Sequence, residues 1–377
     1  MNRWGTRSFV ASGFALIAVA YGLARFAYGL FLPALAAELG LGPTEAGWIG
    51  SGAFAAYCVA TAAAALLCVR IGARRTLLLA GAVAAVGMAG IAASQDAAML
   101  AVSVTFAGLS PGLASPPLAL AVSERIEPVQ QGAANTLINS GTSAGVVLSG
   151  PVALVLAEAW REAYWLFALL SFGVTVWLCY SMPPVAAAKG RAEPKPFREY
   201  MRHRVLMPVL LTSALMGVSS TAIWTFGGAI LSDHAGWTDT RIAGVWIVIG
   251  ASGVAGAAAG PLIRRFGLNE VHRASLAAIA CSILLLSIPG GGLIWGFGSA
   301  VLFGAAYIMM TGVILVWGVE AVPEYPAFGL GAGFLSIAAG QVAGAPVFGY
   351  LYESAGVVPA LLTFSALACL PMAIKRV

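Results

Sequence analysis

Residues 9–35 read FVASGFALIAVAYGLARFAYGLFLPAL, an apolar run that contains one formal charge, Arg25. A run of about 20 apolar residues is long enough to cross the hydrocarbon core of a bilayer as a helix. This run is too long for the apolar core of a signal peptide and ends in no small-residue cleavage site, so we expect it to stay as a first membrane helix.

The rest of the chain has the same composition as this run. Of its 377 residues, 60% are apolar and 9% are charged, whereas about a quarter of the residues in a soluble domain are charged. The 46 glycines scattered through apolar runs suit membrane helices, because small residues let helix backbones approach closely. The five cysteines stand singly, without metal-ligand spacing, so we expect no metal and no cofactor.

Charged or Gly/Pro-rich breaks divide the chain into apolar runs that each fit one crossing. We predict an all-α membrane protein with twelve transmembrane helices at residues 9–35, 46–69, 76–94, 98–122, 130–157, 162–181, 205–231, 241–263, 272–288, 293–318, 327–351 and 357–374. The longest break, 182–204, is predicted to be a cytoplasmic linker between an N-terminal bundle, 1–181, and a C-terminal bundle, 205–377.

The basic residues predict the orientation in the membrane. Arg161 and Arg241 are the only ones expected on the side opposite the two termini. Arginine and lysine concentrate on the cytoplasmic side of membrane proteins, so both termini are predicted to be cytoplasmic, in a bacterial inner membrane. This arrangement accounts for the net charge of +5, and no nucleic-acid partner is expected.

The two halves of the chain match each other when one is shifted by 195 residues. This register pairs Arg70 with Arg265, Gly72 with Gly267, Pro128 with Pro323, Gly145 with Gly340 and Pro151 with Pro346. Matches in one register, at equivalent points of the topology, predict two parallel six-helix repeats with pseudo-symmetry. Such repeats expose a central site to the two sides of a membrane in turn as the halves rock, which predicts a transporter.

Arg25 is the first candidate for a substrate ligand. It lies ten residues from the outer end of the first predicted helix, or about 15 Å deep, where an unpaired arginine costs at least about 2.5 kcal/mol. It either binds a carboxylate, phosphate or polar oxygen of the substrate, or bonds backbone carbonyls freed in the proline-rich turn at 111–117. Tyr21 and Tyr28 are expected on the same helix face, where they either sandwich a flat ligand or pack the bundle.

The repeat predicts an opposing wall for this site. The 195-residue register places Ser220 opposite Arg25, within a polar run that includes Thr221 and Trp224. Single hydroxyls in membrane helices usually bond to their own backbone, so the cluster is better evidence than any one of them. Asn139 belongs to a polar stripe on the fifth predicted helix, which either faces the cavity or joins neighbouring helices by hydrogen bonds.

The sequence offers no obvious proton carrier. Every acidic residue falls in a predicted loop or near a helix end, and we expect no histidine in a core, whereas proton-coupled carriers commonly use an intramembrane Asp, Glu or His. We therefore expect facilitated diffusion, anion exchange, or symport of a proton with a weak-acid substrate. A multidrug or sugar efflux pump driven by proton antiport remains the alternative. No nucleophile elbow, HExxH zinc motif or phosphate-binding loop is present, so an enzyme is not expected.

Four stretches resemble the major facilitator superfamily. Residues 69–75, Val-Arg-Ile-Gly-Ala-Arg-Arg, are similar to its GxxxDRxGRR loop. Residues 141–151 and 340–349 each resemble the glycine–proline motif of its exporters, and residues 22–28 with Pro33 resemble the opening of a little-characterised efflux-permease-like branch with a GxxRFAY first helix. The resemblance implies a secondary transporter that works by alternating access, as a monomer, with a small-molecule substrate and the lipid bilayer as its partners.

The resemblance also assigns roles to residues of this chain. It implies gating by Arg70, Gly72, Arg74, Arg75, Arg265 and Gly267, and close helix packing by Gly141, Gly145, Pro151, Gly340, Gly344 and Pro346. In the family the first, fourth, seventh and tenth helices line the cavity, which adds Tyr307 and Thr311 as candidates for binding the substrate. Val69 stands where the family has an aspartate, so the charge network that locks the cytoplasmic gate is expected to be weaker.

Overall fold

The computed structural model describes residues 3–156, 159–182, 205–288, 290, 292–324 and 326–375. Within these residues the chain is helical and contains no strand, and eleven helices are long and apolar enough to cross a membrane. The twelfth predicted run corresponds to a shorter apolar helix, Val357–Ala373. The predicted linker lies outside the described residues except for Met182.

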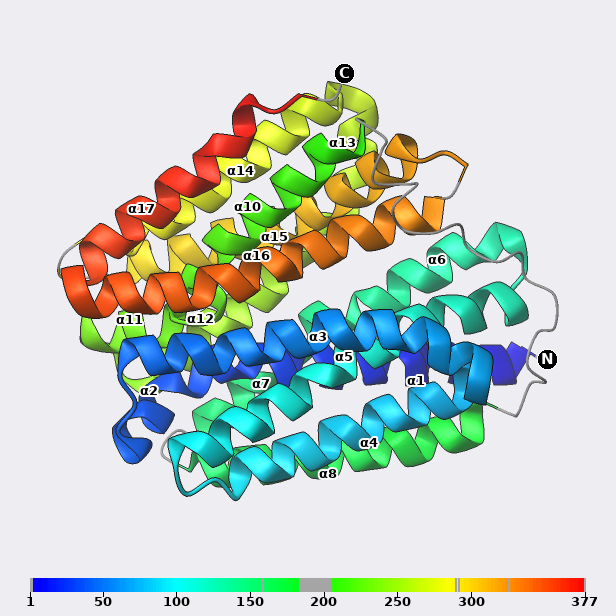
Figure 1. Cartoon of the computed structure of the whole chain (residues 1–377), viewed down its shortest axis with the longest axis horizontal. Helices are drawn as coiled ribbons and strands as arrows, with labels where there is room; N and C mark the ends of the chain where they lie inside the picture. The colour runs from blue at the N-terminus through cyan, green and yellow to red at the C-terminus, as the bar shows by residue number, and fades with distance from the viewer. Residues whose placement is uncertain are drawn as a thin grey trace. The chain divides into compact units, whose positions relative to one another are not determined.

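The first compact unit comprises Met1–Leu41 and Gly52–Gly190. Its helices are α1, Arg3–Ile17; η1, Ala18–Phe26; α2, Ala27–Leu39; α3, Pro43–Ile71; α4, Ala73–Ala92; α5, Ala97–Arg125; α6, Pro128–Asn139; α7, Gly141–Val155; and α8, Trp160–Ser181. The helix α4 packs between α5 and α8 (Figure 1). The first turns of α3 group with the second unit, so this helix contributes to both.

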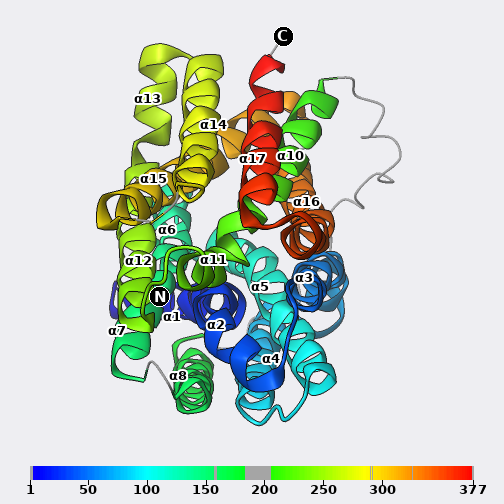
Figure 2. The same ribbon diagram turned by 90° about the vertical axis from the view of Figure 1, so that its left-hand side faces the viewer.

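The second unit comprises Gly42–Ser51 and Arg191–Val377. Its helices are α10, Leu206–Trp224; α11, Gly227–Asp233; α12, Asp239–Ser252; η2, Gly253–Ala258; α13, Ala259–Phe266; α14, Leu268–Leu285; α15, Leu293–Ala321; α16, Pro326–Ala355; α17, Val357–Cys369; and η3, Leu370–Ala373. The helix α10 packs against α16 and α17, and α13 stands beside α14 (Figure 2).

Several of the predicted helices depart locally from α-helical geometry, which the average hydropathy of a run does not reveal. The first helix passes through a π-helical segment, Ala18–Phe26, which includes Arg25. The helix predicted at 205–231 is interrupted at Thr225–Phe226, and the one predicted at 241–263 contains a 3₁₀ segment, Gly253–Ala258. Because π segments occur frequently at functional sites, the first of these departures makes the surroundings of Arg25 a candidate functional site.

The 195-residue register pairs positions that have the same backbone conformation. Gly72 ends α3 with φ +84° and ψ 157°, and Gly267 ends α13 with φ +85° and ψ 154°. Positive φ favours glycine, because a Cβ would clash there. Equal and unusual dihedral angles at paired positions support the internal repeat.

A second pair of glycines makes the same kind of contact in each unit. A Cβ on Gly145 of α7 would overlap the carbonyl oxygen of Ala18 in η1, and a Cβ on Gly340 of α16 would overlap that of Ala214 in α10. In both places one helix backbone lies directly on another, with no side chain between them. Small residues permit this close approach between membrane helices.

Alanine at either position should destabilise the protein. We expect Gly145→Ala and Gly340→Ala each to cost about 1–3 kcal/mol, the usual effect of overpacking, and to lower the melting temperature in detergent. The control is Gly173→Ala in α8, where a Cβ meets nothing within 4 Å; it should be neutral or stabilising by up to about 1 kcal/mol. Equal melting temperatures for all three variants would contradict this account of the packing.

Candidate functional site

Arg25 lies in the π-helical segment of the first membrane helix and has 7% of its surface exposed. Its guanidinium carbon lies 4.4 Å from the ring centre of Tyr57 and 4.9 Å from that of Phe54, both in α3. The rings of Phe26, at 5.3 Å, and Tyr21, at 5.8 Å, belong to its own segment. Four aromatic rings thus surround one cation inside the membrane-spanning region, an arrangement that stabilises its charge. We call Arg25 and these four residues the Arg25 cage.

Tyr21 connects the cage to a third helix. Its hydroxyl lies 2.8 Å from that of Ser115 in α5, and its ring meets that of Tyr57 edge-on at 6.1 Å. Ser115 lies inside the proline-rich turn that the sequence singled out as a possible partner of Arg25. Tyr28, the other predicted flanking tyrosine, is buried in the first turn of α2, beyond the π-helical segment.

The second unit holds a compact cluster of aromatic and polar side chains. The ring of Trp224, at the end of α10, packs edge-on against Phe303 at 5.2 Å and Tyr307 at 5.3 Å, both in α15. The amide nitrogen of Gln341 in α16 lies 3.3 Å from the Ser220 hydroxyl and 3.4 Å from the Tyr307 hydroxyl. All five side chains are buried, and we call them the Trp224 cluster.

Several of the predicted hydroxyl ligands bond to their own helices. Ser220 donates to the carbonyl oxygen of Gly217 and Thr221 to that of Val218. Thr311, half-buried in α15, donates to the carbonyl oxygen of Ile308, one turn earlier in the same helix. These bonds satisfy the hydroxyl protons and leave the oxygen lone pairs as acceptors, and that of Ser220 already accepts from Gln341.

The remaining candidates lie at helix ends or inside helix contacts. Asn139 is exposed at the last position of α6, just before the chain continues into α7. Gly141 approaches the backbone of α1, and Gly344 approaches the backbone of α10. Pro151 lies inside α7, ten residues after Gly141, and Pro346 lies inside α16, two residues after Gly344.

Of the predicted gating residues, Arg74 has defined partners. Its guanidinium donates to the carbonyl oxygens of Met182, at 2.5 Å, and Cys179, at 2.9 Å, at the end of α8. Carbonyls in the last turn of a helix lack partners within that helix, and a basic side chain can satisfy them. Arg74 therefore joins two helices of the first unit. Its neighbour Arg75 is exposed, as are two more predicted gating residues, Arg70 and Arg265.

The expectation that no histidine lies in a core is wrong for His272. Its side chain is fully buried in the second turn of α14, with its ring 5.4 Å from that of Trp317 in α15. Among the described residues neither ring nitrogen of His272 has a hydrogen-bond partner. Charged neighbours lower the local hydropathy, so the sequence predicts a helix that begins only at His272, whereas α14 begins four residues earlier, at Leu268. No three His, Cys, Asp or Glu residues of the described chain are grouped to hold a metal ion.

The sequence identified the centre of each cluster and missed much of its surroundings. Phe54 and Tyr57 share one face of α3 by their spacing of three, but nothing in the sequence places that face against Arg25. Phe303 and Tyr307 are likewise four residues apart in α15, and Phe303 was missed because it is indistinguishable from any core phenylalanine. Tertiary packing, rather than a local motif, assembles both clusters.

The fold and the sequence resemble those of known transporters. The protein resembles the chloramphenicol resistance protein of Streptomyces lividans, with 26% identity over 284 residues, which cover 73% of this chain and 70% of that protein. The nucleoside transporter NupG superimposes with a TM-score of 0.78 at 13% identity, over 99% of this chain and 98% of its own. The xylose transporter XylE from E. coli also gives 0.78 at 13% identity, over 97% and 96% of the two chains.

At these identities the solved structures share the fold with this protein and say nothing of its substrate. The sequence profile of the Major Facilitator Superfamily matches residues 14–345, which include both the Arg25 cage and the Trp224 cluster. The chain therefore belongs to the Major Facilitator Superfamily, and it is a multi-pass membrane transporter rather than an enzyme.

Proposed function

We propose that this protein is a secondary or facilitative transporter that moves a small organic solute with an anionic or strongly polar group by alternating access. The observation that carries the proposal is Arg25, a cation buried in a π-helical segment of a membrane-spanning helix. The distribution of basic residues supports a location in a bacterial cytoplasmic membrane, with both termini on the cytoplasmic side.

The Arg25 cage supports an anionic substrate for electrostatic reasons. Aromatic faces stabilise a buried cation without neutralising it, so the positive potential at the guanidinium remains. A carboxylate that replaces water beside such a group gains a charge-assisted hydrogen bond in a medium of low dielectric constant. Tyr21 is only half-buried, so the cage is not closed on every side.

Within the second unit, the Trp224 cluster suits a solute that has a flat or apolar part. Trp224 and Tyr307 offer ring faces and edges, and Gln341 together with Ser220 offers amide and hydroxyl groups. The hydrogen bonds within the cluster, 3.3 and 3.4 Å long, exceed the usual 2.7–3.2 Å range and are therefore weak. A ligand with a polar group can exchange with them at little cost.

A thermal-stability screen tests the proposal. The detergent-purified protein is heated with benzoate, chloramphenicol, uridine, xylose and tetraphenylphosphonium in turn. A ligand present at 100 times its dissociation constant stabilises a protein by about 2.7 kcal/mol. We expect stabilisation by the aromatic carboxylate, reduced in Arg25→Lys because lysine lacks the planar fork of arginine, and lost in Arg25→Gln.

The matched control is Arg241→Gln, which removes an exposed arginine and should leave the response to benzoate unchanged. Each variant is first checked for a single monodisperse species in detergent. If benzoate stabilises the Arg25→Gln variant as much as the parent, or if only the cation or the neutral compounds stabilise the parent, the anionic substrate is disproved.

A second candidate function is proton-driven export, which two observations favour. The related protein from Streptomyces lividans is named for chloramphenicol resistance, and His272 provides the second unit with a buried titratable group. Ionisable residues inside membrane segments are a usual place for coupling protons to transport. Charged residues lie close to His272 in the sequence. Glu270 and Arg273 stand on either side of it, and Glu320 follows Trp317, its ring partner, by one helical turn.

Reconstitution distinguishes this candidate from the first. In liposomes with an imposed pH gradient, an antiporter that uses His272 should accumulate labelled chloramphenicol in the parent and lose that accumulation at least tenfold in His272→Gln. The variant should retain exchange of labelled for unlabelled solute, which requires no net proton movement. His234→Gln, at the C-terminal cap of α11, is the matched control and should behave as the parent.

Two results would disprove coupling through His272. One is accumulation that persists at the parental level in His272→Gln. The other is exchange that disappears together with accumulation, because that outcome indicates damage to the transport cycle as a whole.

A further inference from the structure

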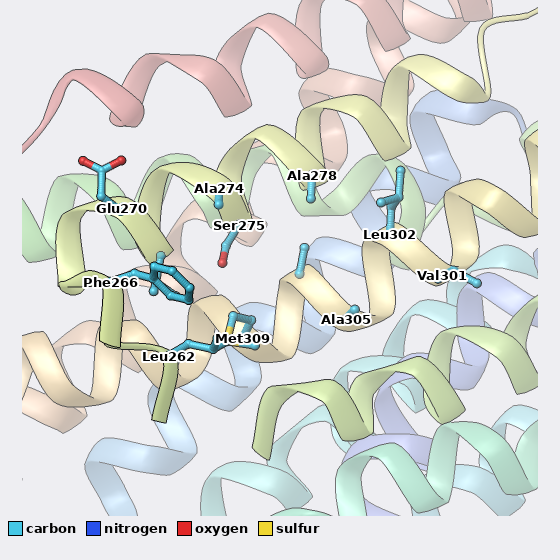
Figure 3. A pocket seen from close by; sticks show the side chains of 12 residues that line it. Leu262, Phe266, Glu270, Ala274, Ser275, Ala278, Val301, Leu302, Ala305 and Met309 are labelled. Carbon is cyan, nitrogen blue, oxygen red and sulfur yellow. The ribbon is translucent and has the colours of Figure 1, made fainter. Parts of the chain in front are cut away.

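A groove on the second unit runs between α14 and α15 and ends at α13 (Figure 3). Its volume is about 670 Å³, within the roughly 300–1,000 Å³ range of ligand pockets. Ten of its twelve lining residues are apolar, and the two polar ones are Glu270 and Ser275. No residue of the Arg25 cage or the Trp224 cluster lines the groove, so it is separate from the proposed substrate site.

Small side chains leave this space open. Ala274 and Ala278 of α14 face the groove on one side, and Ala305 and Ala306 of α15 face it on the other. The larger side chains of α13 close one end. Ala274 and Val301 are exposed, so the groove is open along its length rather than enclosed in the unit.

Basic residues outnumber acidic ones beside the α13 end of the groove, where Glu270 is the one charged residue that lines it. Arg264 and Arg265 are the last basic residues of α13, and the guanidinium carbon of Arg265 lies 5.1 Å from the ring centre of Phe266, which lines the groove. Glu270, the acidic residue at this end, is held in an ion pair of 2.9 Å with Arg273. Three arginines against one glutamate leave a net positive charge. The N-terminal end of α14 lies here as well, and its helix dipole has the same sign.

We infer that this groove binds one acyl chain of an anionic phospholipid, with the headgroup phosphate at Arg264 and Arg265. The helices that form it belong to membrane-spanning segments, so the medium that meets an exposed apolar groove there is hydrocarbon. Each buried methylene of an acyl chain contributes about 0.8 kcal/mol of binding free energy relative to water. This contribution is the same for every lipid, so it does not select one headgroup over another. The arginines supply the selectivity, because basic pockets at the ends of membrane helices bind negative headgroups.

The positions of the apolar groove and of the arginines beside its end agree with the shape of such a lipid. The chain lies along the alanines of α14 and α15, and the glycerophosphate lies beyond Phe266, where α13 turns into α14 at Gly267. A water-soluble apolar ligand would need a closed site to exclude water, whereas this groove is open on one side. A lipid suits an open groove, since its other chain remains in the bilayer.

Photo-crosslinking in nanodiscs tests the inference with position-specific evidence. The full chain is reconstituted with trace phosphatidylglycerol or phosphatidylcholine that carries the same diazirine in one acyl chain, and the labelled peptides are mapped by mass spectrometry. We expect phosphatidylglycerol to label residues 262–309 at least fivefold more than phosphatidylcholine does. Equal labelling by the two lipids would mean ordinary contact with the bilayer and would overturn the inference.

Two variants separate the roles of the groove and the charge. Ala274→Phe fills the groove and should abolish the preferential labelling, whereas Ala82→Phe, at an exposed alanine of α4, should not. Arg264→Gln combined with Arg265→Gln should bring the ratio of phosphatidylglycerol to phosphatidylcholine labelling close to one. Arg70→Gln combined with Arg75→Gln removes the same charge from the first unit and should leave that ratio unchanged.

Labelling that is insensitive to Ala274→Phe would place the lipid elsewhere, and a ratio that survives the loss of both arginines would remove the basis for selectivity. Either result would refute the inference. Neither bears on the substrate, so the proposed function and the lipid site can fail independently.

Discussion

The architecture of this protein depends on one constraint: in hydrocarbon, every backbone amide and carbonyl must find its partner within the protein. Helices meet that demand within a single segment, and the described part of the chain is accordingly helical. Helices in a bilayer gain nothing from hiding apolar faces from one another, so close packing must hold them together. The contacts of Gly145 with Ala18 and of Gly340 with Ala214 meet this need in each unit.

The same constraint explains why the helices were predictable from sequence. A membrane span needs about 20 apolar residues whatever it packs against, and the predicted runs coincide with the observed helices to within a few residues. The 195-residue register pairs Gly72 with Gly267, and both have a positive φ, which favours glycine at each position. The twelfth predicted run corresponds to the shorter apolar helix Val357–Ala373, at the lower limit of the length that spans a bilayer.

The site was less predictable, because its residues come from different helices. Arg25 was evident as a lone charge in an apolar run, but the faces of α3 and α5 that surround it follow from packing that the sequence does not specify. The π-helical segment changes the angles at which side chains leave the helix axis. The amino-acid composition of the run does not reveal this change. The error at His272 has a related cause: the charged residues Glu270 and Arg273, on the same turn, made a buried histidine resemble one at a helix end.

The π-helical segment has a consequence for how the site is encoded. Gly22 and Arg25 are three residues apart, a spacing that an α-helix places on one side. The wider turn of η1 separates them, so Gly22 lies against the backbone of Gly145 while Arg25 reaches the rings of α3. The surplus residue that a π segment contains is therefore part of the geometry of the Arg25 cage. The site is specified by the length of the segment from Ala18 to Phe26 as well as by its side chains, and a relative one residue shorter there would orient its arginine differently even with every aromatic partner retained.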